Sequence, residues 1–459
     1  MSPHRRIDVV LDSVKRLQRI GATANLLNLL QKQHPADLAE VLSDLPDRER
    51  RSVFDTLFER NSRLAMEALS ELEPEVRVPL LVEHPAEELS RVLQDLPPDD
   101  AAALIADLPE ILAASVLECM HRKESDEVQH LLDYADQTAG RIMNPDVFAL
   151  SEDLTAGEAI QALQQAADVE MVFYLYVVDG RRHLVGVISL RRLLLVSPET
   201  PLKRIMTADL TTARVDTDQE EVAQLVASYN LLAIPVVDEE SKLVGMITVD
   251  DVIDVIKDEA TEDIYRMAGV SSDEHVFTSA GESIRKRLPW LGINLFTAIL
   301  AAMVVTIFRD ELASVDFVAL ASFMTIVASM GGNAATQTLT VVVRGIALGE
   351  LTWSNSRRVL VKEAVVGIGN GLILGVVGAG VAWFVVGSPF FGGILALAMV
   401  VNLLVAAMAA TLIPIALRAM KVDPALASSV FITTLTDMFG FFAFLGLATL
   451  FVDQLAGIP

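Results

Sequence analysis

The amino-acid sequence predicts a multidomain membrane protein with an all-α helical-repeat N-terminal domain, an α/β pair of repeated domains, a connecting helix and an all-α transmembrane domain with five helices. Three observations lead to this fold class. Of the 459 residues 52% are hydrophobic, yet the net charge is −25. The charged and the apolar residues lie in different parts of the chain, and two stretches of sequence occur twice. One soluble globule of average composition does not combine such hydrophobicity with such charge.

The charge divides the chain at Pro289. Residues 289–459 contain seven basic and eight acidic side chains, so nearly all of the net negative charge lies in residues 1–288. Nucleic-acid binding requires positive charge that displaces counterions, and the acidic balance therefore excludes a basic nucleic-acid-binding protein. We expect no nucleic-acid partner, and we expect a lipid bilayer around the apolar part.

Residues 1–135 are expected to form a helical domain. The segment HPADLAEVLSDLPD (34–47) returns as HPAEELSRVLQDLPPDD (84–100). In both copies the apolar residues have helical spacing and prolines mark the helix ends. Internal similarity of this kind is typical of a small solenoid of packed helices. An ordinary helical bundle with a chance repeat is the alternative.

Residues 136–200 and 201–265 are expected to be two copies of one α/β domain. The first copy begins with RIMNPDVFALSEDLTAGEAIQAL and continues with LYVVDGRRHLVGVISLRRLL (175–194). The second copy begins with RIMTADLTTARVDTDQEEVAQL and continues with IPVVDEESKLVGMITVDDVI (234–253). Each copy predicts a strand, a helix, two apolar strands joined by a polar turn, and a closing helix. This tandem pattern resembles a pair of CBS domains, which pack as a pseudo-dimer and commonly bind nucleotides or metals.

Five apolar segments follow residue 288, at 289–308, 317–343, 363–386, 393–417 and 430–452. A helix needs about 20 residues to cross the hydrocarbon. Basic residues precede the first segment and lie in the loops after the second and the fourth. The positive-inside rule places these loops in the cytosol, and the N-terminus lacks the apolar core of a signal peptide. We therefore expect cytosolic N-terminal domains and an external C-terminus.

The segment VDDVIDVIKDEATEDIYRM (249–267) gathers acidic residues on one side of a helix. Like charges at such spacings cost roughly 0.2–0.5 kcal/mol per pair, and only Lys257 and Arg266 are near in sequence to offset them. A divalent cation such as Mg²⁺, held by one or two carboxylates and water, would supply the missing charge. A solvated charged face is the alternative. The acidic residues are Asp251, Asp254, Asp258, Glu259, Glu262 and Asp263.

Asp437 is the one acidic residue that the sequence places well inside an apolar segment. A carboxylate at that depth is costly unless it meets water or a cation, so we expect a functional role; a buried, protonated carboxyl is the alternative. Polar residues in the same segments are expected to line a water-filled path or a helix interface. They include Asn333, Thr336, Gln337 and Thr338, Asn402, and Thr433, Thr434, Thr436 and Gly440.

The helical domain and the tandem α/β pair are followed along the chain by VDDVIDVIKDEATEDI, GGNAATQ and KVDPALASSVFITTLTD. Features in this order resemble the MgtE family of magnesium channels or transporters, and the resemblance covers nearly the whole chain. The resemblance implies a homodimer in the bacterial plasma membrane, with a pore on the two-fold axis that is selective for hydrated Mg²⁺. It also implies a connecting helix over residues 266–288, ahead of the transmembrane domain 289–459. Mg²⁺ bound to the cytosolic domains would hold the gate shut.

The resemblance also assigns residues by position. Asp437 is the expected pore residue, and Asp423 is expected in the cytosolic loop that faces the connecting helix. The candidate lining residues are Asn333, Thr336, Gln337, Thr433 and Gly440. The expected Mg²⁺ sensor residues are Asp95 of the N-terminal domain, Asp218 and Glu220 of the second CBS domain, and Asp251, Asp254, Glu259, Glu262 and Asp263.

Three positions depart from the family pattern. Asn230 stands where the family often has an acid, so a metal shared with Asp254 would lose a charge. Arg192 replaces the aspartate that usually holds a ribose, and Leu231 replaces an aromatic residue of some ATP-binding members. These departures argue against nucleotide binding, and ATP is not among the expected ligands.

The expected function is Mg²⁺ influx down its electrochemical gradient, with Mg²⁺ as both substrate and regulator. A proton- or sodium-coupled divalent cation carrier of the same architecture is one alternative. A membrane-anchored metal sensor without transport is the other. No enzymatic activity is expected, because the sequence contains no nucleophile–base pair, P-loop or histidine metal triad.

Overall fold

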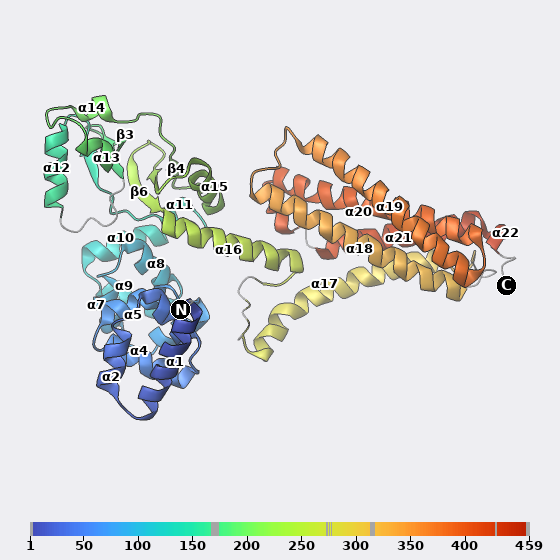
Figure 1. Cartoon of the computed structure of the whole chain (residues 1–459), viewed down its shortest axis with the longest axis horizontal. Helices are drawn as coiled ribbons and strands as arrows, with labels where there is room; N and C mark the ends of the chain where they lie inside the picture. Colours follow the sequence, from blue (N-terminus) through green and yellow to red (C-terminus); the bar gives the residue numbers. More distant parts are fainter. Residues whose placement is uncertain are drawn as a thin grey trace. The chain divides into compact units, whose positions relative to one another are not determined.

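The computed structural model describes residues 3–166, 174–271, 274, 276, 278–312, 317–426 and 429–455. The chain divides into two compact units, Met1–Val255 and Ile256–Pro459. Helices dominate both units, and all of the described strands belong to the first (Figure 1). The fold class predicted from the sequence is confirmed by the helical N-terminal domain, the tandem α/β pair and the five long apolar helices.

Short helices make up the N-terminal domain, and prolines set where many of them begin. Pro35, Pro74 and Pro98 occupy the first helical position of their helices, where a missing N–H costs nothing. The helices are α1 (Pro3–Arg19), α2 (Thr23–Leu30), α3 (Pro35–Ser43), α4 (Asp47–Phe58), α5 (Ser62–Ser70), α6 (Pro74–Leu81), α7 (Ala86–Leu93), α8 (Pro98–Ala106), α9 (Glu110–Cys119) and α10 (Arg122–Leu132).

The repeated sequence of this domain corresponds to a repeated arrangement of helices. The two copies of the repeat form α3 with α4 and α7 with α8. Helices α3, α5, α7 and α9 contact one another in succession, and Leu42, Leu69 and Leu93 from three of them are fully buried. A row of helices that each bury one face against the next is the packing that the repeat predicts.

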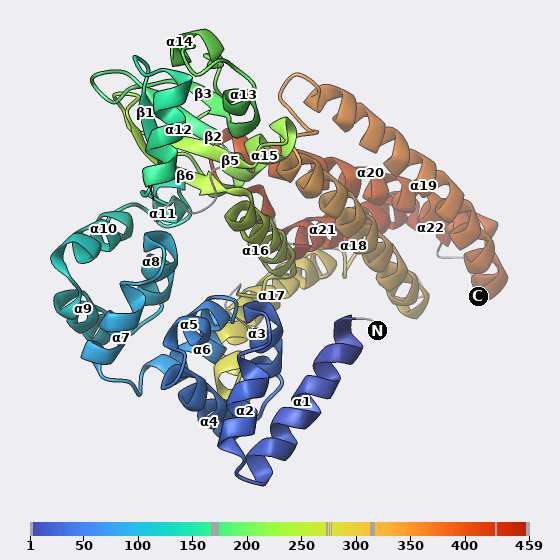
Figure 2. The same ribbon diagram turned by 60° about the vertical axis from the view of Figure 1, so that its left-hand side comes forward.

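The tandem α/β pair contains two three-stranded sheets of the same topology. In each, the first two strands are parallel, the last two are antiparallel, and the register shifts at equivalent valines, Val177/Val178 and Val236/Val237. Figure 2 shows the sheets together with their flanking helices. The elements are α11 (Ala139–Ile142), β1 (Ala149–Ser151), α12 (Ala156–Gln165), β2 (Tyr174–Val178), β3 (Leu184–Ser189), α13 (Leu190–Leu194), α14 (Leu202–Ile205), β4 (Ala213–Arg214), α15 (Gln219–Tyr229), β5 (Ala233–Val237), β6 (Leu243–Thr248) and α16 (Val249–Ala268).

The repeated RIM and LVG motifs pack against each other across the two halves. Met143 lies over Gly245 in β6, and Met206 lies over Gly186 in β3. A Cβ atom at either glycine would approach the methionine sulfur to 2.5 or 2.6 Å. Each half therefore places the methionine at its start on the sheet of the other, and both motifs are explained by close packing.

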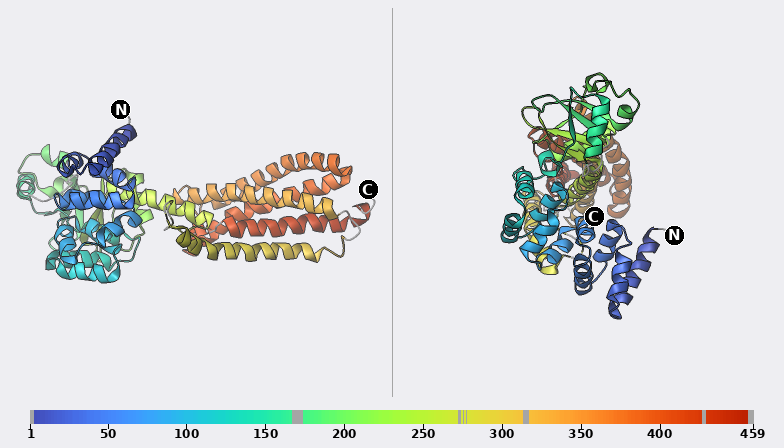
Figure 3. Two further views of the ribbon diagram at one scale, coloured as in Figure 1. Left: turned by 90° about the horizontal axis from the view of Figure 1, so that it is seen from below. Right: turned by 90° about the vertical axis from the view of Figure 1, so that its left-hand side faces the viewer.

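The second unit contains five helices long and apolar enough to cross a membrane, as the sequence predicted. They run side by side, coloured from yellow to red in Figure 3 (left). They are α17 (Ala280–Ile307), α18 (Phe317–Ala347), α19 (Ser356–Val386), α20 (Pro389–Ala419) and α21 (Ser429–Leu450); the short η1 (Pro424–Leu426) and α22 (Val452–Leu455) flank α21.

The N-terminal part of α17 overlaps the connecting helix expected over residues 266–288. Residues 280–288 are the first turns of α17, which continues through Pro289 into the membrane segment. Pro289 removes one backbone hydrogen bond, and the helix continues on both sides of it. Residues 280–307 thus form one described helix.

Helix α20 is the centre of the membrane unit, because it contacts α18, α19 and α21. Its contact with α19 depends on small residues. A Cβ atom at Gly371 of α19 would lie 2.7 Å from Val400 Cα, and one at Gly367 would lie 2.8 Å from the Leu403 carbonyl oxygen. Small residues at helix crossings allow the backbones to approach closely in membranes.

Candidate functional site

One face of α18 exposes a stripe of polar side chains. Asn333, Thr336, Gln337 and Thr340 follow one another at intervals of one to four residues, and all four are exposed in this chain. Helical spacing places them on one side of α18. Polar side chains against lipid are unfavourable and usually face water or another protein surface. This face of α18 is therefore a candidate wall of an ion path.

A buried asparagine fixes the helices behind that wall. Asn402 of α20 is fully buried, and its Nδ2 donates to the Val327 carbonyl oxygen of α18 at 2.8 Å. A Cβ atom at Gly331 of α18 would lie 2.3 Å from Asn402 Nδ2, and one at Gly440 of α21 would lie 2.8 Å from it. Gly440, expected as a lining residue, is itself buried in this contact. Three helices thus meet at Asn402 because two of them present a glycine.

Asp437 lies on α21, one turn before Gly440, and is half-buried. Thr433 precedes it by one turn, and a Cβ atom at Gly332 of α18 would lie 3.3 Å from the Thr433 Cγ2 atom. The glycine pair at 331–332 therefore brings α21, with Asp437, close to α18. The expected pore residue and the polar stripe belong to neighbouring helices.

Several threonine hydroxyls of α18 and α21 use their hydrogens within their own helix. Thr336 donates to the Gly332 carbonyl oxygen at 3.0 Å, and Thr340 donates to the Thr336 carbonyl oxygen at 2.9 Å. On α21, Thr436 donates to the Thr433 carbonyl oxygen at 2.8 Å. A hydroxyl oxygen still has acceptor capacity when its hydrogen is used. At Thr336 and Thr340 the exposed wall can therefore accept hydrogen bonds from the water of a hydrated cation.

In the first unit, Asp99 at the start of α8 interacts electrostatically with Asp251 of α16. Asp251 accepts hydrogen bonds from the Thr248 N–H and hydroxyl, and burial raises its pKa. The Asp99 Oδ1 atom is buried without a described hydrogen-bond partner. Burial, and then the charge of Asp251, raise the pKa of Asp99 to about 8. Two carboxylates in such a site favour a shared proton or a cation.

Asp99 was missed by the sequence reasoning, which pointed to Asp95. Asp95 lies in the turn between α7 and α8 and is exposed. Asp99 is one of two acids in the PPDD segment that closes the second repeat. That segment was the available signal, but only the tertiary contact with a residue about 150 positions away distinguishes Asp99 from its neighbours.

The end of α16 is joined by an ion pair to the loop before α21. Arg266 forms ion pairs with Glu262 on its own helix and with Asp423. Asp423 also accepts a hydrogen bond from the Ala425 N–H at 2.7 Å. Burial raises the pKa of Asp263, which lies on the same turns of α16. Asp423 and α16 are thus in contact through the Arg266 guanidinium, which pairs with two of the expected acids.

The remaining expected sensor residues have local partners or face solvent. Asp218 caps α15 by accepting from the Glu220 N–H at 2.8 Å. Gln224 donates to Glu220 at 3.3 Å. Asp254 is exposed, and Glu259 is half-buried. Within the described parts of this single chain, no three His, Cys, Asp or Glu side chains are arranged to hold a metal ion.

A second acid within the membrane unit was not singled out from the sequence. Glu363 is the eighth residue of α19 and is only 4% exposed. It accepts hydrogen bonds from Thr338 at 3.2 Å and from Lys362 at 2.7 Å. The sequence reasoning began the third apolar segment at this residue and so treated it as a boundary. Its burial follows from α19 beginning at Ser356 rather than at residue 363.

Family models match three parts of the chain. Residues 324–447 match MgtE, described as a divalent cation transporter, and residues 33–137 match the MgtE intracellular N domain. Residues 139–199 and 202–258 match the CBS domain. The magnesium transporter MgtE of Bacillus subtilis (strain 168) is 38% identical over 340 residues, which cover 74% of this chain and 75% of that protein. The chain belongs to the MgtE family.

A further MgtE relative and a solved structure agree with this membership. The magnesium transporter MgtE of Thermus thermophilus is 37% identical over 330 residues, covering 71% of this chain and 73% of that protein. The crystal structure of the cytosolic domain of the Mg²⁺ channel MgtE in complex with ATP is 36% identical, with a TM-score of 0.50. It covers 53% of this chain and 99% of that chain. MgtE proteins are magnesium transporters, not a family of enzymes.

Proposed function

We propose that this chain is a Mg²⁺-selective channel that admits Mg²⁺ passively and closes when intracellular Mg²⁺ is high. The exposed polar face of α18 carries this proposal, because α18 contacts α21, the helix of Asp437, in the region that matches a divalent cation transporter. In a homodimer, two such faces would meet around the two-fold axis. Each subunit would then contribute one Asp437 carboxylate to a shared, water-filled path.

The homodimer is supported by surfaces that one chain leaves uncovered. On α16, Ile253 is 60% exposed and Ile264 is 62% exposed. Exposed apolar side chains on one helix mark an interaction surface when they lie together. The polar face of α18 needs a partner for the opposite reason, because lipid cannot satisfy it.

The driving force would be the membrane potential. At an inside-negative potential, each charge gains about 2.3 kcal/mol per 100 mV, and a divalent ion gains about twice that amount. Mg²⁺ dehydrates reluctantly, so two facing Asp437 carboxylates would attract the hydrated ion without stripping its water. The threonine oxygens of α18 and the amides of Asn333 and Gln337 would contact that water.

Closure would follow from tighter Mg²⁺ binding in the closed state. Acids on α16, with Asp95, Asp99, Asp218 and Glu220, carry like charges that Mg²⁺ would neutralise. Each ion adds its differential binding free energy to the bias towards the closed state. Asp423 and Arg266 connect the end of α16 to the loop before α21, which is a physical route from these acids to the helix that carries Asp437.

The proposed location is the bacterial plasma membrane, with residues 1–288 in the cytosol and the C-terminus outside. The basic residues Arg344, Arg357, Arg358 and Arg418 support this orientation, because they lie in the last turn of α18, the first turn of α19 and the last turn of α20, which border the connections after the second and fourth membrane helices. We retain 1–135, 136–200, 201–265, 266–288 and 289–459 as the proposed functional divisions, with α17 continuous across the last boundary.

Mg²⁺ flux into liposomes that contain the purified chain tests the proposal. We expect flux that increases with an inside-negative voltage and that Asp437→Asn abolishes, because the variant keeps the size of the side chain and loses the charge. Asp453→Asn, in the exposed α22, is the matched control and should leave flux unchanged. Undiminished Mg²⁺ flux in the Asp437→Asn variant would falsify the pore assignment.

The same liposomes separate the channel from its alternatives. Flux that stops when a proton or sodium gradient is collapsed at constant voltage identifies a coupled carrier. No flux in any condition, together with Mg²⁺ binding to the soluble domains, identifies a sensor without transport. A channel requires flux that depends only on voltage and the Mg²⁺ gradient.

Gating is tested by varying the Mg²⁺ concentration on the cytosolic side. We expect inhibition by Mg²⁺ to weaken when Asp251, Asp254 and Glu259 are neutralised together as amides. Protection of the soluble domains against protease by Mg²⁺ should weaken in the same variant. An unchanged protection curve would contradict the assignment of these acids as sensors.

A further inference from the structure

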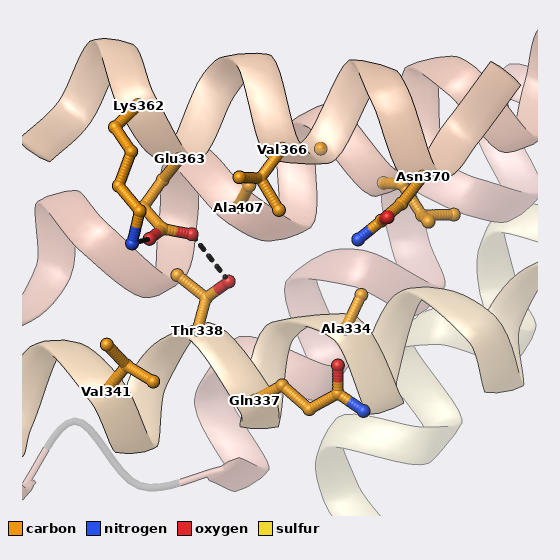
Figure 4. A pocket seen from close by; sticks show the side chains of 11 residues that line it. Ala334, Gln337, Thr338, Val341, Lys362, Glu363, Val366, Asn370 and Ala407 are labelled. Carbon is orange, nitrogen blue, oxygen red and sulfur yellow. Dashed lines mark hydrogen bonds and ion pairs between the residues drawn. The ribbon is translucent and has the colours of Figure 1, made fainter. Parts of the chain in front are cut away.

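A pocket of about 210 Å³ lies between α18, α19 and α20. Figure 4 shows Lys362, Glu363 and Asn370 on α19, facing Gln337 and Thr338 on α18. Ala407 of α20 lines the pocket as well. The pocket therefore combines one acid, one base, two amides and a hydroxyl with an apolar wall, inside the membrane unit.

The acid of this pocket is fixed in place. The Glu363 side chain is 5% exposed, and its Oε2 atom accepts the Thr338 hydroxyl hydrogen at 3.2 Å. Thr338 is itself only 8% exposed. A buried carboxylate that lacks a positive partner is strongly destabilising. Some cation must therefore accompany Glu363 whenever it is ionised.

The present partner of Glu363 is held much less firmly. Lys362 contacts the Glu363 Oε1 atom at 2.7 Å, but its own side chain is 61% exposed. Successive residues on a helix do not face each other, so the lysine must fold back along α19 to make this pair. A flexible, exposed ammonium in that geometry is easily replaced. Its departure would leave Oε1 open towards the pocket.

The pocket has the size and the chemistry of a hydrated divalent cation. A volume of about 210 Å³ holds about seven water molecules at roughly 30 Å³ each. Mg²⁺ is octahedral, and proteins usually hold it through one or two carboxylates with water in the remaining positions. The Gln337 and Asn370 amides provide oxygen acceptors for such water.

We propose that this pocket is a second cation site of the membrane unit, at which a hydrated divalent cation replaces the Lys362 ammonium beside Glu363. The lysine then acts as a tethered competitor that occupies the site when no divalent ion is present. Binding at this site goes beyond the proposed channel activity and does not depend on it.

The route to the site does rest on the proposed function. Gln337 lines the pocket and also belongs to the exposed polar face of α18. Glu363 lies about 10 Å along α19 from its first residue, on the side that we assign to the cytosol. An ion that leaves Asp437 would meet this site before the cytosol. Several moderately favourable sites in series allow ions both to enter and to leave a pore.

Mn²⁺ binding next to a nitroxide spin label tests the proposal on the full-length chain. Cys119 is the single cysteine of the chain, so Cys119→Ser with Val341→Cys carries one label at the pocket mouth, where Val341 is 58% exposed. Bound Mn²⁺ broadens the spectrum of a nearby nitroxide. We expect broadening that saturates with Mn²⁺ and that persists in Asp437→Asn, which lacks the charge of the pore.

Two variants with opposite expected effects separate a cation site from a structural ion pair. Glu363→Gln keeps the hydrogen bond to Thr338 and should require at least about tenfold more Mn²⁺ for half-broadening. Lys362→Met removes the competitor and should require about tenfold less; each factor corresponds to about 1.4 kcal/mol. Changes in the same direction in both variants, or broadening that disappears in Asp437→Asn, would overturn the proposal. The result is independent of Mg²⁺ flux, which tests the proposed function separately.

Discussion

The acid pair at Asp99 and Asp251 predicts a soluble portion that weakens as the pH rises. Asp99 has a pKa of 3.8 when unperturbed and of about 8 in the folded chain. Because the folded value lies above the unfolded one, folding stability is complete below pH 3.8 and is lost as the pH rises to about 8. One pKa unit corresponds to about 1.36 kcal/mol, so the loss reaches about 2 kcal/mol at pH 5 and about 4 kcal/mol at pH 7.

Asp99→Asn should recover most of this loss. The amide has the size of the carboxylic acid and cannot ionise, so in the absence of divalent ions the variant should be more stable than the parent chain at pH 7. Below pH 4 the two should be equal. Asp95→Asn removes the same charge from an exposed position a few residues earlier, and it should change stability by less than about 0.5 kcal/mol.

Hydrogen–deuterium exchange of the full-length chain measures the effect where it arises. Peptides from α8 and the first turns of α16 should exchange more slowly in Asp99→Asn than in the parent chain at pH 7. Added Mg²⁺ should slow exchange in the parent and have a much smaller effect in the variant, because the cation would otherwise neutralise the pair. Equal exchange in the parent and Asp99→Asn at pH 7 without Mg²⁺ would refute the reasoning.

Three further predictions concern the membrane unit, its link to α16 and the CBS pair. Gly331→Ala places a Cβ atom 2.3 Å from Asn402 Nδ2 and should cost about 1–3 kcal/mol of stability by overpacking, which would be measured as a lower unfolding temperature in detergent. Gly380→Ala is the control, because a Cβ atom at that position has nothing within 4 Å. Equal unfolding temperatures of the two variants would contradict the Asn402 junction. Arg266→Gln removes the ion pairs to Glu262 and Asp423. It should raise Mg²⁺ flux at low internal Mg²⁺ a few-fold, as expected for the loss of a partly exposed ion pair that contributes about 1 kcal/mol. Lys257→Gln serves as the control, and flux unchanged by Arg266→Gln would show that the ion pairs do not keep the gate closed. The CBS pair should bind ATP weakly or not at all in equilibrium dialysis, because Arg192 and Leu231 stand at the expected contact positions; stoichiometric binding would contradict that interpretation.

Much of the architecture could be predicted because periodicity and hydropathy are local properties. The repeats at residues 34 and 84 identified the stacked helices, the two RIM and LVG copies identified paired sheets, and the apolar segments identified five membrane helices. The same local signals place the boundary of the membrane domain at Pro289, and α17 begins before that proline and continues through it. A proline weakens a helix at one hydrogen bond, and the residues on both sides decide whether it ends.

The sites were harder to predict because they depend on contacts between distant residues. Nothing in the PPDD segment indicates that Asp99 interacts electrostatically with Asp251. Lys362 and Glu363 look like the polar edge of an apolar segment, yet Glu363 is buried against Thr338. Asn402 was expected to face a water-filled path or a helix interface, and its contacts with Gly331 and Gly440 place it at a junction of three helices. In each case the role of the side chain depends on a residue far away in the sequence, and local sequence patterns do not indicate which residue that is.

The hydroxyl groups on the exposed face of α18 also bear on which sign of charge can pass. The hydroxyl groups of Thr336 and Thr340 donate hydrogen bonds to backbone carbonyl oxygens of their own helix. These two hydroxyl oxygens therefore present lone pairs to the solvent. Water around a cation turns its hydrogens outward and fits such a wall, whereas water around an anion turns its oxygens outward and does not. These two uncharged hydroxyl groups thus favour hydrated cations over hydrated anions, a preference that the amide groups of Asn333 and Gln337 on the same face, which both donate and accept, do not share.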